Sequence, residues 1–350
     1  MPDGAADFDM IKKLHYKVRG LPTPLAGLAL GIASLGWCLE NALPLHGWGQ
    51  LTGAGIASTL LVFLSIRFAA HADTLWDDLQ HPVVGSIVPT FAMTLMVISA
   101  SIGRIDANAG TAVWLFAIFL HLTAFFIFSY WRMNDPKLDL MVPSWFVPPI
   151  GIVVACVSFP NAWALLPLAS ALFWFGLGAY AIMLPLMIYR LIFLNEVPNA
   201  AKPTIAIMAA PASLLLAGYL TIEQNPSFLL CSLLFGIAVL MTFVIYFSFW
   251  RLMRLQFSPG YAAFTFPMAI GATALFKLAD RLQYYPGCLE YCEQIRWLAS
   301  FELAVAAAVI GYVAVLYALN IRKFLPETIP AERQGETDDA QVRQIKLQQS

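Results

Sequence analysis

The sequence predicts an all-α integral membrane protein with ten transmembrane helices. Two features of composition indicate this: 60% of the 350 residues are hydrophobic and only 12% are charged, whereas a typical soluble domain has about 25% charged residues. A third observation is a series of apolar runs, each long enough to provide the roughly 20 residues that cross the hydrocarbon core. A soluble fold could not cover so much apolar surface, so we expect much of it to face lipid.

Ten apolar runs follow one another along residues 21–322, the predicted membrane domain. They begin near Leu25, Gly49, Val83, Ala109, Trp145, Trp163, Thr204, Phe228, Tyr261 and Trp297. The segments between them carry polar and turn residues, as in HADTLWDDLQHP and RMNDPKLDLMVP. Residues 1–20 mix acids and bases, and residues 323–350 are polar and poor in aromatic residues, so we predict two tails outside the membrane.

The Lys and Arg residues predict the orientation, because loops rich in them stay in the cytoplasm. All but four of the 20 Lys and Arg residues fall in the tails or on the same side as the tails. The four on the opposite side are Arg104, Lys277, Arg281 and Arg296. We therefore expect both termini in the cytoplasm, as an even number of spans also requires, and a place in the plasma membrane, which in bacteria is the inner membrane.

Proline recurs on one parity of the predicted spans. The odd-numbered spans carry, at intervals of 56 to 65 residues, Pro24, Pro89, Pro148 with Pro149, Pro211 and Pro267. This interval is the length of a two-helix hairpin, so the pattern predicts five tandem helical hairpins. Proline frees a backbone carbonyl, which is tolerated in a membrane only where protein or water can satisfy it. We therefore expect the five odd-numbered, proline-kinked helices to form an inner ring around a pore and the five even-numbered helices to form an outer ring.

The predicted pore is neutral. The charged residues within spans are Glu40, Lys277 and Glu302, and we place all three near the outer ends of their spans, which leaves the midplane uncharged. His121 falls on an outer-ring span as a packing or lipid-side residue, and a lone histidine cannot supply the paired ligands of a haem. No nucleophile stands beside a base, so we expect neither an enzyme nor a bound cofactor. The net charge of −1 argues against nucleic acid as a partner.

Because the predicted midplane has no charged residue, we expect aromatic and small residues to line the pore and to close it. Phe264 and Phe266 stand two residues apart, about 200° around a helix, so only one of them can face the centre. Phe266 adjoins Pro267 and is the predicted gate, because a bulky apolar ring excludes water from a pore. The predicted pore-lining residues are Pro24, Gly27, Pro89, Pro149, Pro211 and Pro267.

The outer side of the ninth span carries two cations and leads to two cysteines. Lys277 and Arg281 form a candidate funnel where anions would arrive. Cys288 and Cys292 lie in the predicted outer loop, and their spacing leaves open whether they form a disulfide. Two cysteines at this spacing are a weak signal for a metal, so we expect no metal site.

Four segments together resemble the tellurite-resistance/dicarboxylate transporter family, which includes TehA-like bacterial proteins and the plant slow-type anion channels. These segments are LPTPLAGLALGIASLGWCLEN, DDLQHPV, MAAPASLLLAGYLTI and YAAFTFPMAIGATA. The resemblance implies a homotrimer with a pore in each subunit. It also implies that a phenylalanine matched to Phe266 blocks the pore midway, and that a glycine matched to Gly27 tolerates no bulky replacement.

Three functions stay open at the level of the sequence. We favour a passive channel for small anions such as chloride and nitrate, because a neutral pore with a phenylalanine plug offers no site for coupling protons. The alternative is a proton-linked transporter of C4-dicarboxylates such as malate, or of sulfite or tellurite oxyanions. The third is a membrane sensor or scaffold that conducts nothing. The expected partners are small anions, membrane lipid and further copies of the chain.

Overall fold

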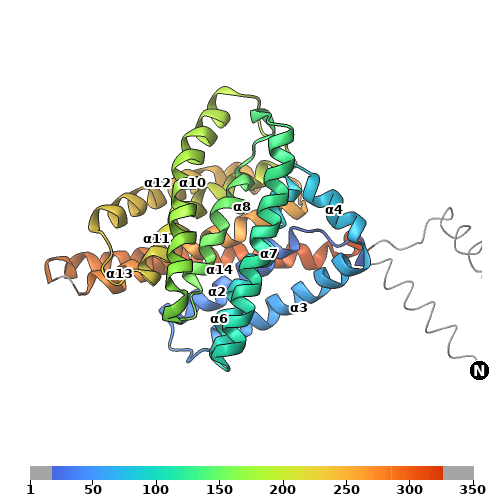
Figure 1. Cartoon of the computed structure of the whole chain (residues 1–350). Coiled ribbons are helices and arrows are strands. Elements are labelled where there is room, and N and C mark those ends of the chain that lie inside the picture. The colour runs from blue at the N-terminus through green and yellow to red at the C-terminus, as the bar shows by residue number, and fades with distance from the viewer. Residues whose placement is uncertain (1–17, 285, 326–350) are drawn as a thin grey trace, which may run out of the picture.

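The computed structural model describes residues 18–284 and 286–325, so most of the two predicted tails lies outside the described residues. Every regular element within these two ranges is helical, which confirms the predicted all-α class. Figure 1 shows the helices packed together in one bundle.

The elements follow the chain in a simple order. They are α2 (Leu25–Ala42), α3 (Trp48–Ala70), α4 (Ala72–Gln80), α5 (Val84–Ile87), α6 (Thr90–Gly103), α7 (Ala107–Asn134), η1 (Leu138–Leu140), η2 (Pro143–Phe146), α8 (Val147–Ile150), η3 (Gly151–Val153), α9 (Val154–Val157), η4 (Trp163–Leu165), α10 (Leu166–Phe193), η5 (Lys202–Ala209), α11 (Ala210–Ile222), α12 (Phe228–Leu252), η6 (Pro259–Phe264), α13 (Thr265–Leu282), η7 (Pro286–Cys288), α14 (Leu289–Leu319) and α15 (Ile321–Phe324).

Nine helical segments of the described chain are long and apolar enough to cross a membrane. The predicted fifth span differs, because the apolar segment Pro143–Val157 is shorter and is divided into η2, α8, η3 and α9. Its prolines cannot donate backbone hydrogen bonds, which favours short turns over one long helix. In Figure 1, α8 lies between α7 and α10, and it packs on both.

Side chains of α7 complete the hydrogen bonds of this divided segment. His121 is fully buried, and its Nε2 lies 2.8 Å from the carbonyl oxygen of Pro148. The indole of Trp114 donates to the carbonyl oxygen of Ala155 at 3.0 Å. Backbone carbonyls inside a membrane need such partners, because water does not reach them. His121 is therefore a packing residue, and the lipid-side alternative is wrong.

Replacing Trp114 with phenylalanine tests this role of α7. The smaller ring retains much of the packing but leaves the Ala155 carbonyl without its donor, which is expected to destabilise the fold by about 1–3 kcal/mol. The measurement is thermal unfolding of the purified protein in detergent. Trp163→Phe is the control, because that indole is 62% exposed; equal losses in both variants would mean that the hydrogen bond contributes little.

The prolines of the predicted odd-numbered spans stand at helix starts, not in helix middles, whereas Pro185 lies inside α10. Pro24 and Pro89 are the N-cap residues of α2 and α6, and Pro211 is the second residue of α11. Pro267 is the third residue of α13, and α13 begins directly after η6 ends. A backbone N–H in the first turn of a helix has no intrahelical partner, so proline removes no hydrogen bond there. For Pro211 and Pro267 the predicted kink is thus a joint between a 3-10 helix and an α-helix.

The proline-bearing segments contact one another in a closed ring. α2 packs on α6 and on α13, α6 packs on α9, and α11 packs on both α9 and α13. α13 and α11 are largely buried, whereas α7, α10 and α12 expose large apolar side chains. We call the end of the bundle at which α2 begins and α14 ends the terminal end, and the opposite end the far end.

Candidate functional site

A cavity of about 60 Å³ lies inside the ring, in its half toward the terminal end. Each ring segment contributes to the wall, with Leu30 of α2, Met93 of α6, Ile150 of α8, Leu214 of α11 and Phe266 of α13. No charged side chain of the described residues lines it, and Thr90 supplies a hydroxyl. The cavity is therefore a neutral space shared by all five segments.

A second cavity, of about 20 Å³, lies further toward the far end. It is lined by later residues of the same segments, such as Ser34, which follows Leu30 by one turn of α2. Phe266 and Leu214 line both cavities. These two side chains therefore lie between the cavities, at the place where a continuous path would have to pass.

Phe264 points away from this path. It is fully buried, and its ring packs edge-on against Phe249 of α12 and Tyr261, with centroids 5.7 Å and 5.1 Å apart. The opposite directions of Phe264 and Phe266 follow from their spacing along the backbone. The structure thus places Phe266 at the cavities and Phe264 in the packing between helices, while the role of Phe266 as a gate stays a prediction.

Four of the six predicted lining residues border the larger cavity: Pro24, Gly27, Pro211 and Pro267. Pro89 and Pro149 do not border it, and Thr90 and Ile150 take their places. Adjacent residues of a helix point about 100° apart, so the residue after each of these prolines faces the centre. The positions of the prolines thus identified the segments that form the ring, but they did not identify every residue that lines the cavity.

Residues 25–318 match the SLAC1 family, whose description is voltage-dependent anion channel. The chain belongs to the SLAC1 family. It is 24% identical over 234 residues to a protein of Methanocaldococcus jannaschii named an uncharacterized transporter, a match that covers 60% of this chain and 68% of that protein. It is also 24% identical over 268 residues to the tellurite resistance protein TehA homolog of Haemophilus influenzae, which covers 73% of this chain and 81% of that protein. These matches confirm the resemblance predicted from the sequence.

In this SLAC1-family chain, α2 approaches α13 most closely at Gly31, one turn after Gly27. A Cβ atom at Gly31 would overlap the side chain of Thr265, whereas a Cβ atom at Gly27 would lie 3.4 Å from the Cβ of Ala262, an ordinary contact. Thr265 is held in place because its hydroxyl lies 3.0 Å from the Gly27 carbonyl oxygen, which accepts its hydrogen bond. Sequence reasoning singled out Gly27 and missed Gly31.

Gly31→Val is expected to destabilise the protein by about 1–3 kcal/mol, because the added side chain forces α2 and α13 apart. Gly27→Ala is the matched control, and it should fold like the parent protein while narrowing the larger cavity. Folded yield and thermal unfolding in detergent measure both effects. If Gly27→Ala is as destabilising as Gly31→Val, the assignment of the close contact is wrong.

The two cations of the predicted funnel lie in different surroundings. Lys277 comes one turn after Thr273, which lines the smaller cavity, so it lies beyond that cavity toward the far end. Arg281 instead donates to the carbonyl oxygens of Leu220 and Glu223, each at 3.2 Å, where α11 ends. Helix ends leave carbonyls without partners, and Arg281 satisfies two of them. A hydrogen bond to a neutral carbonyl leaves the charge of Arg281 in place, so a steering role stays a prediction for both Lys277 and Arg281.

Cys288 and Cys292 do not form a disulfide in the SLAC1-family chain, because both are free thiols. Cys288 is the N-cap residue of α14. Cys292 is buried, and its thiol donates to the carbonyl oxygen of Ala279 at 3.1 Å. The second cysteine thus helps to pack α14 on α13.

Glu302 lies in the interior of α14, not near its outer end as the sequence suggested. The error came from the start of this span, which we placed near Trp297 but which the structure places at Leu289. Glu302 is 5% exposed, and it lines a cavity of about 10 Å³ behind α13, where a Cβ atom at Gly271 would lie 2.5 Å from its Oε2. It forms no ion pair with any of the described residues. An acid buried in this way is a common mark of a functional site in membrane proteins.

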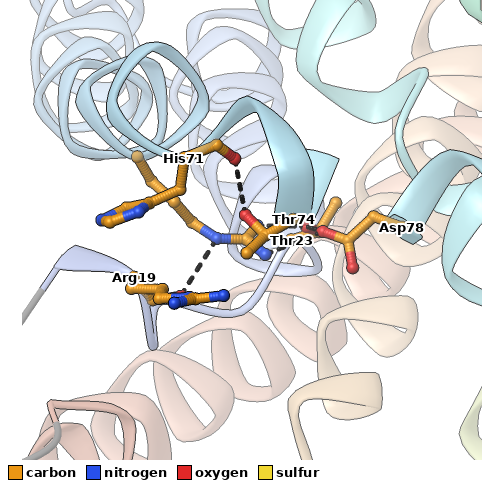
Figure 2. A network of polar contacts seen from close by, with 6 residues as sticks. Arg19, Thr23, His71, Thr74 and Asp78 are labelled. Carbon is orange, nitrogen blue, oxygen red and sulfur yellow. Dashed lines mark hydrogen bonds and ion pairs between the residues drawn. The ribbon is translucent and has the colours of Figure 1, made fainter. Parts of the chain in front are cut away.

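An ion-pair network holds the start of α2 at the terminal end, as Figure 2 shows. Arg67, in the last turn of α3, pairs with Asp78 of α4 at 2.8 Å and donates to the Thr23 hydroxyl at 2.6 Å. Thr23 in turn donates to Asp78 at 2.5 Å. Thr23 precedes Pro24 in the wall of the larger cavity, so the network positions one side of the cavity mouth.

Sequence reasoning counted Arg67 only as a charge on the cytoplasmic side. The signal that could have revealed the network is the DDLQHPV segment, because an acid next to a span that ends in arginine can pair with it. The outer part of the network is a second pair, Arg19 with Asp73 at 3.0 Å, and this pair is much more exposed.

Proposed function

We propose that this SLAC1-family chain is a passive channel for small anions such as chloride and nitrate. The observation that carries the proposal is the pair of neutral cavities inside the ring, with Phe266 and Leu214 between them. A neutral path holds no fixed charge that would trap an anion, and a constriction of apolar side chains can gate by excluding water. Lys277, beyond the smaller cavity, would raise the local anion concentration at the far mouth.

The proposed assembly has ten spans in five hairpins, both termini in the cytoplasm, and three chains in the plasma membrane, each with its own pore. Ten spans are supported by Pro143–Val157, since its pieces η3 and α9 contact both α6 and α11 and so complete the ring. The orientation is supported by the distribution of Lys and Arg. The exposed apolar side chains of α7, α10 and α12 offer a surface for lipid or for neighbouring chains.

Reversal potentials in planar bilayers test the channel. Purified protein is reconstituted, and current is recorded under a chloride gradient and then under opposed chloride and nitrate. A passive anion pore is expected to reverse near the equilibrium potential of chloride, with no change when a pH gradient is added. A reversal potential that follows the pH gradient would favour a proton-linked carrier, and no current in any condition would favour a sensor or scaffold.

A proton-linked transporter of malate, sulfite or tellurite oxyanions is the second candidate, and Glu302 is the observation that favours it. An acid inside a membrane helix, without an ion pair among the described residues, can take up and release a proton during a transport cycle. The hydroxyls of Ser213 and Thr242 line the same small cavity.

Glu302→Gln separates the two candidates, because glutamine retains the shape of the side chain but cannot carry a proton. For a channel, conductance and reversal potential are expected to match those of the parent protein. For a proton-linked carrier, uptake of labelled malate or sulfite driven by a pH gradient would fall by roughly tenfold or more, as losses of essential proton-transfer groups do. Uptake into proteoliposomes with and without the gradient is the measurement.

A further inference from the structure

A basic pocket of about 390 Å³ lies at the terminal end of the bundle, outside the ring of cavities. Its wall comes from the end of α10, the loop that follows, the start of η5 and the end of α12. The charged residues in this wall are Arg190, Glu196, Lys202 and Arg251. Three cations against one acid make the pocket a site for an anion.

Arg190 is a rigid member of this wall. Its side chain is 1% exposed, and it donates to the carbonyl oxygens of Asn195 at 2.8 Å and of Asp139 at 3.0 Å. Both acceptors are neutral backbone groups, and its Nε has no hydrogen-bond partner. Arg190 forms no ion pair within the described ranges. Its charge is therefore fixed at the pocket and not neutralised by a carboxylate.

The other two cations are more exposed than Arg190. Lys202 pairs with Glu196 at 3.3 Å, but the Glu196 side chain is 89% exposed, and such solvated pairs are weak. Arg251 lies exposed in the last turn of α12 and forms no ion pair with a described residue. Lys202 and Arg251 are thus free to contact a ligand that also approaches Arg190.

Apart from Ser248, the rest of the pocket lining is apolar, and the pocket lies between the ends of α10 and α12. Its apolar wall is formed by Leu191, Val197, Ile205, Leu252 and Leu255. The neighbouring turns of α10 and α12 expose large apolar side chains, among them Phe193 and Trp250. A free inorganic anion would gain nothing from contact with apolar walls, whereas the acyl chains of a lipid would cover them. Tryptophan is also usual in membrane helices at the level of the lipid headgroups.

We propose that this pocket binds the phosphate headgroup of an anionic phospholipid, with Lys202 and Arg251 as its cationic contacts and the buried Arg190 adding positive charge from the pocket wall. Basic pockets between membrane helices on the cytoplasmic side suit such headgroups. Most of the Lys and Arg residues among those that the structure describes lie on the side predicted to be cytoplasmic, so the lipid would come from the cytoplasmic leaflet. The proposal does not depend on conduction, because it concerns a site outside the central path.

Lipid titration of the full-length protein tests the proposal. The purified protein in detergent is titrated with phosphatidylglycerol, with phosphatidylcholine and with inorganic phosphate, and binding is followed by native mass spectrometry and by the shift in melting temperature. Phosphatidylglycerol is expected to bind and to raise the melting temperature, while phosphatidylcholine has a much smaller effect. Inorganic phosphate that binds as strongly as phosphatidylglycerol would overturn the assignment to a lipid.

A matched pair of double variants locates the site. Lys202→Gln with Arg251→Gln is expected to weaken phosphatidylglycerol binding by roughly tenfold or more. Arg322→Gln with Lys323→Gln removes the same charge from the exposed α15 at the same end, and it is expected to leave binding unchanged. These replacements avoid Arg190, whose bonds to the backbone serve the fold. Equal losses in both double variants, or no loss in the first, would overturn the proposal.

Discussion

Replacing Phe266 with alanine is expected to raise the anion current by roughly tenfold, which corresponds to a barrier lowered by ~1.4 kcal/mol. The ring borders both cavities, of about 60 Å³ and about 20 Å³, and its removal would join them into one path. An anion cannot cross a dry apolar constriction without water or dipoles to replace its hydration. Whole-cell or oocyte current, normalised to the amount of protein at the surface, is the measurement.

Phe264→Ala is the control for this experiment. Phe264 is buried against Phe249 and Tyr261, so its truncation is expected to reduce stability by about 3–5 kcal/mol and not to open the path. The two variants are therefore compared at matched surface expression. The gate assignment is wrong if Phe266→Ala conducts no more than the parent protein, or if Phe264→Ala conducts more than Phe266→Ala.

Leu214 provides a graded comparison from α11, the neighbour of α13 in the ring. It borders both cavities together with Phe266, but its side chain is smaller. Leu214→Ala is therefore expected to raise the current by less than Phe266→Ala, and the double variant is expected to conduct most. A current that rises only in the Leu214 variant would assign the constriction to α11 and not to α13.

Asp78→Ala is expected to reduce stability by about 3–5 kcal/mol, because it leaves a buried guanidinium without its counter-charge. The side chain of Arg67 is 7% exposed and that of Asp78 is 21% exposed. Loss of the pair also leaves the Thr23 hydroxyl without its acceptor at the mouth of the larger cavity. Thermal unfolding in detergent and the yield of folded protein on a sizing column are the measurements.

The neighbouring pair supplies the control for Asp78. Arg19 Nη2 lies 3.0 Å from Asp73 Oδ2, and the two side chains are 29% and 60% exposed. Exposed ion pairs contribute at most about 1 kcal/mol to the stability of the fold. Asp73→Ala is therefore expected to melt close to the parent protein. A combined Arg67→Met and Asp78→Leu replacement should recover part of the loss, because it removes both charges together. Equal melting temperatures for the Asp73 and Asp78 variants would show that the contribution of these ion pairs to stability does not depend on their burial.

Composition and the spacing of the apolar runs and prolines predicted the helical membrane fold, and the family was predicted from four segments that resemble it. The apolar runs predicted nine of the spans directly, since the length of a run is a local property that hydrocarbon thickness selects. The fifth run was found but not its division, because the breaks in Pro143–Val157 depend on donors from α7 that satisfy its carbonyls. The predicted first residues of the spans were the least accurate part of the prediction. The start predicted for α14 was too late in the chain, and this led to the wrong depth for Glu302.

For the candidate site, helical spacing correctly separated Phe264 from Phe266 in direction, because the angle between residues two apart is set by the local helical backbone, here across the junction of η6 and α13. Their roles stay predictions. Arg281 could not be placed in this way, since its partners are carbonyls of α11, about 60 residues earlier in the chain. Gly31 was missed for the same reason, because the side chain that makes it necessary belongs to α13.

The sequence by itself determined that this chain is a helical membrane protein of the SLAC1 family, because apolar content, proline spacing and family motifs are all written along the chain. Only the tertiary structure decided which residues come together: Phe266 and Leu214 at the same two cavities, Arg67 with Asp78, and Glu302 beside α13. The physical reason is that the apolar face of a helix can be read from its own residues, and this face must be covered. The segment that covers it is selected by packing between segments that are distant in sequence.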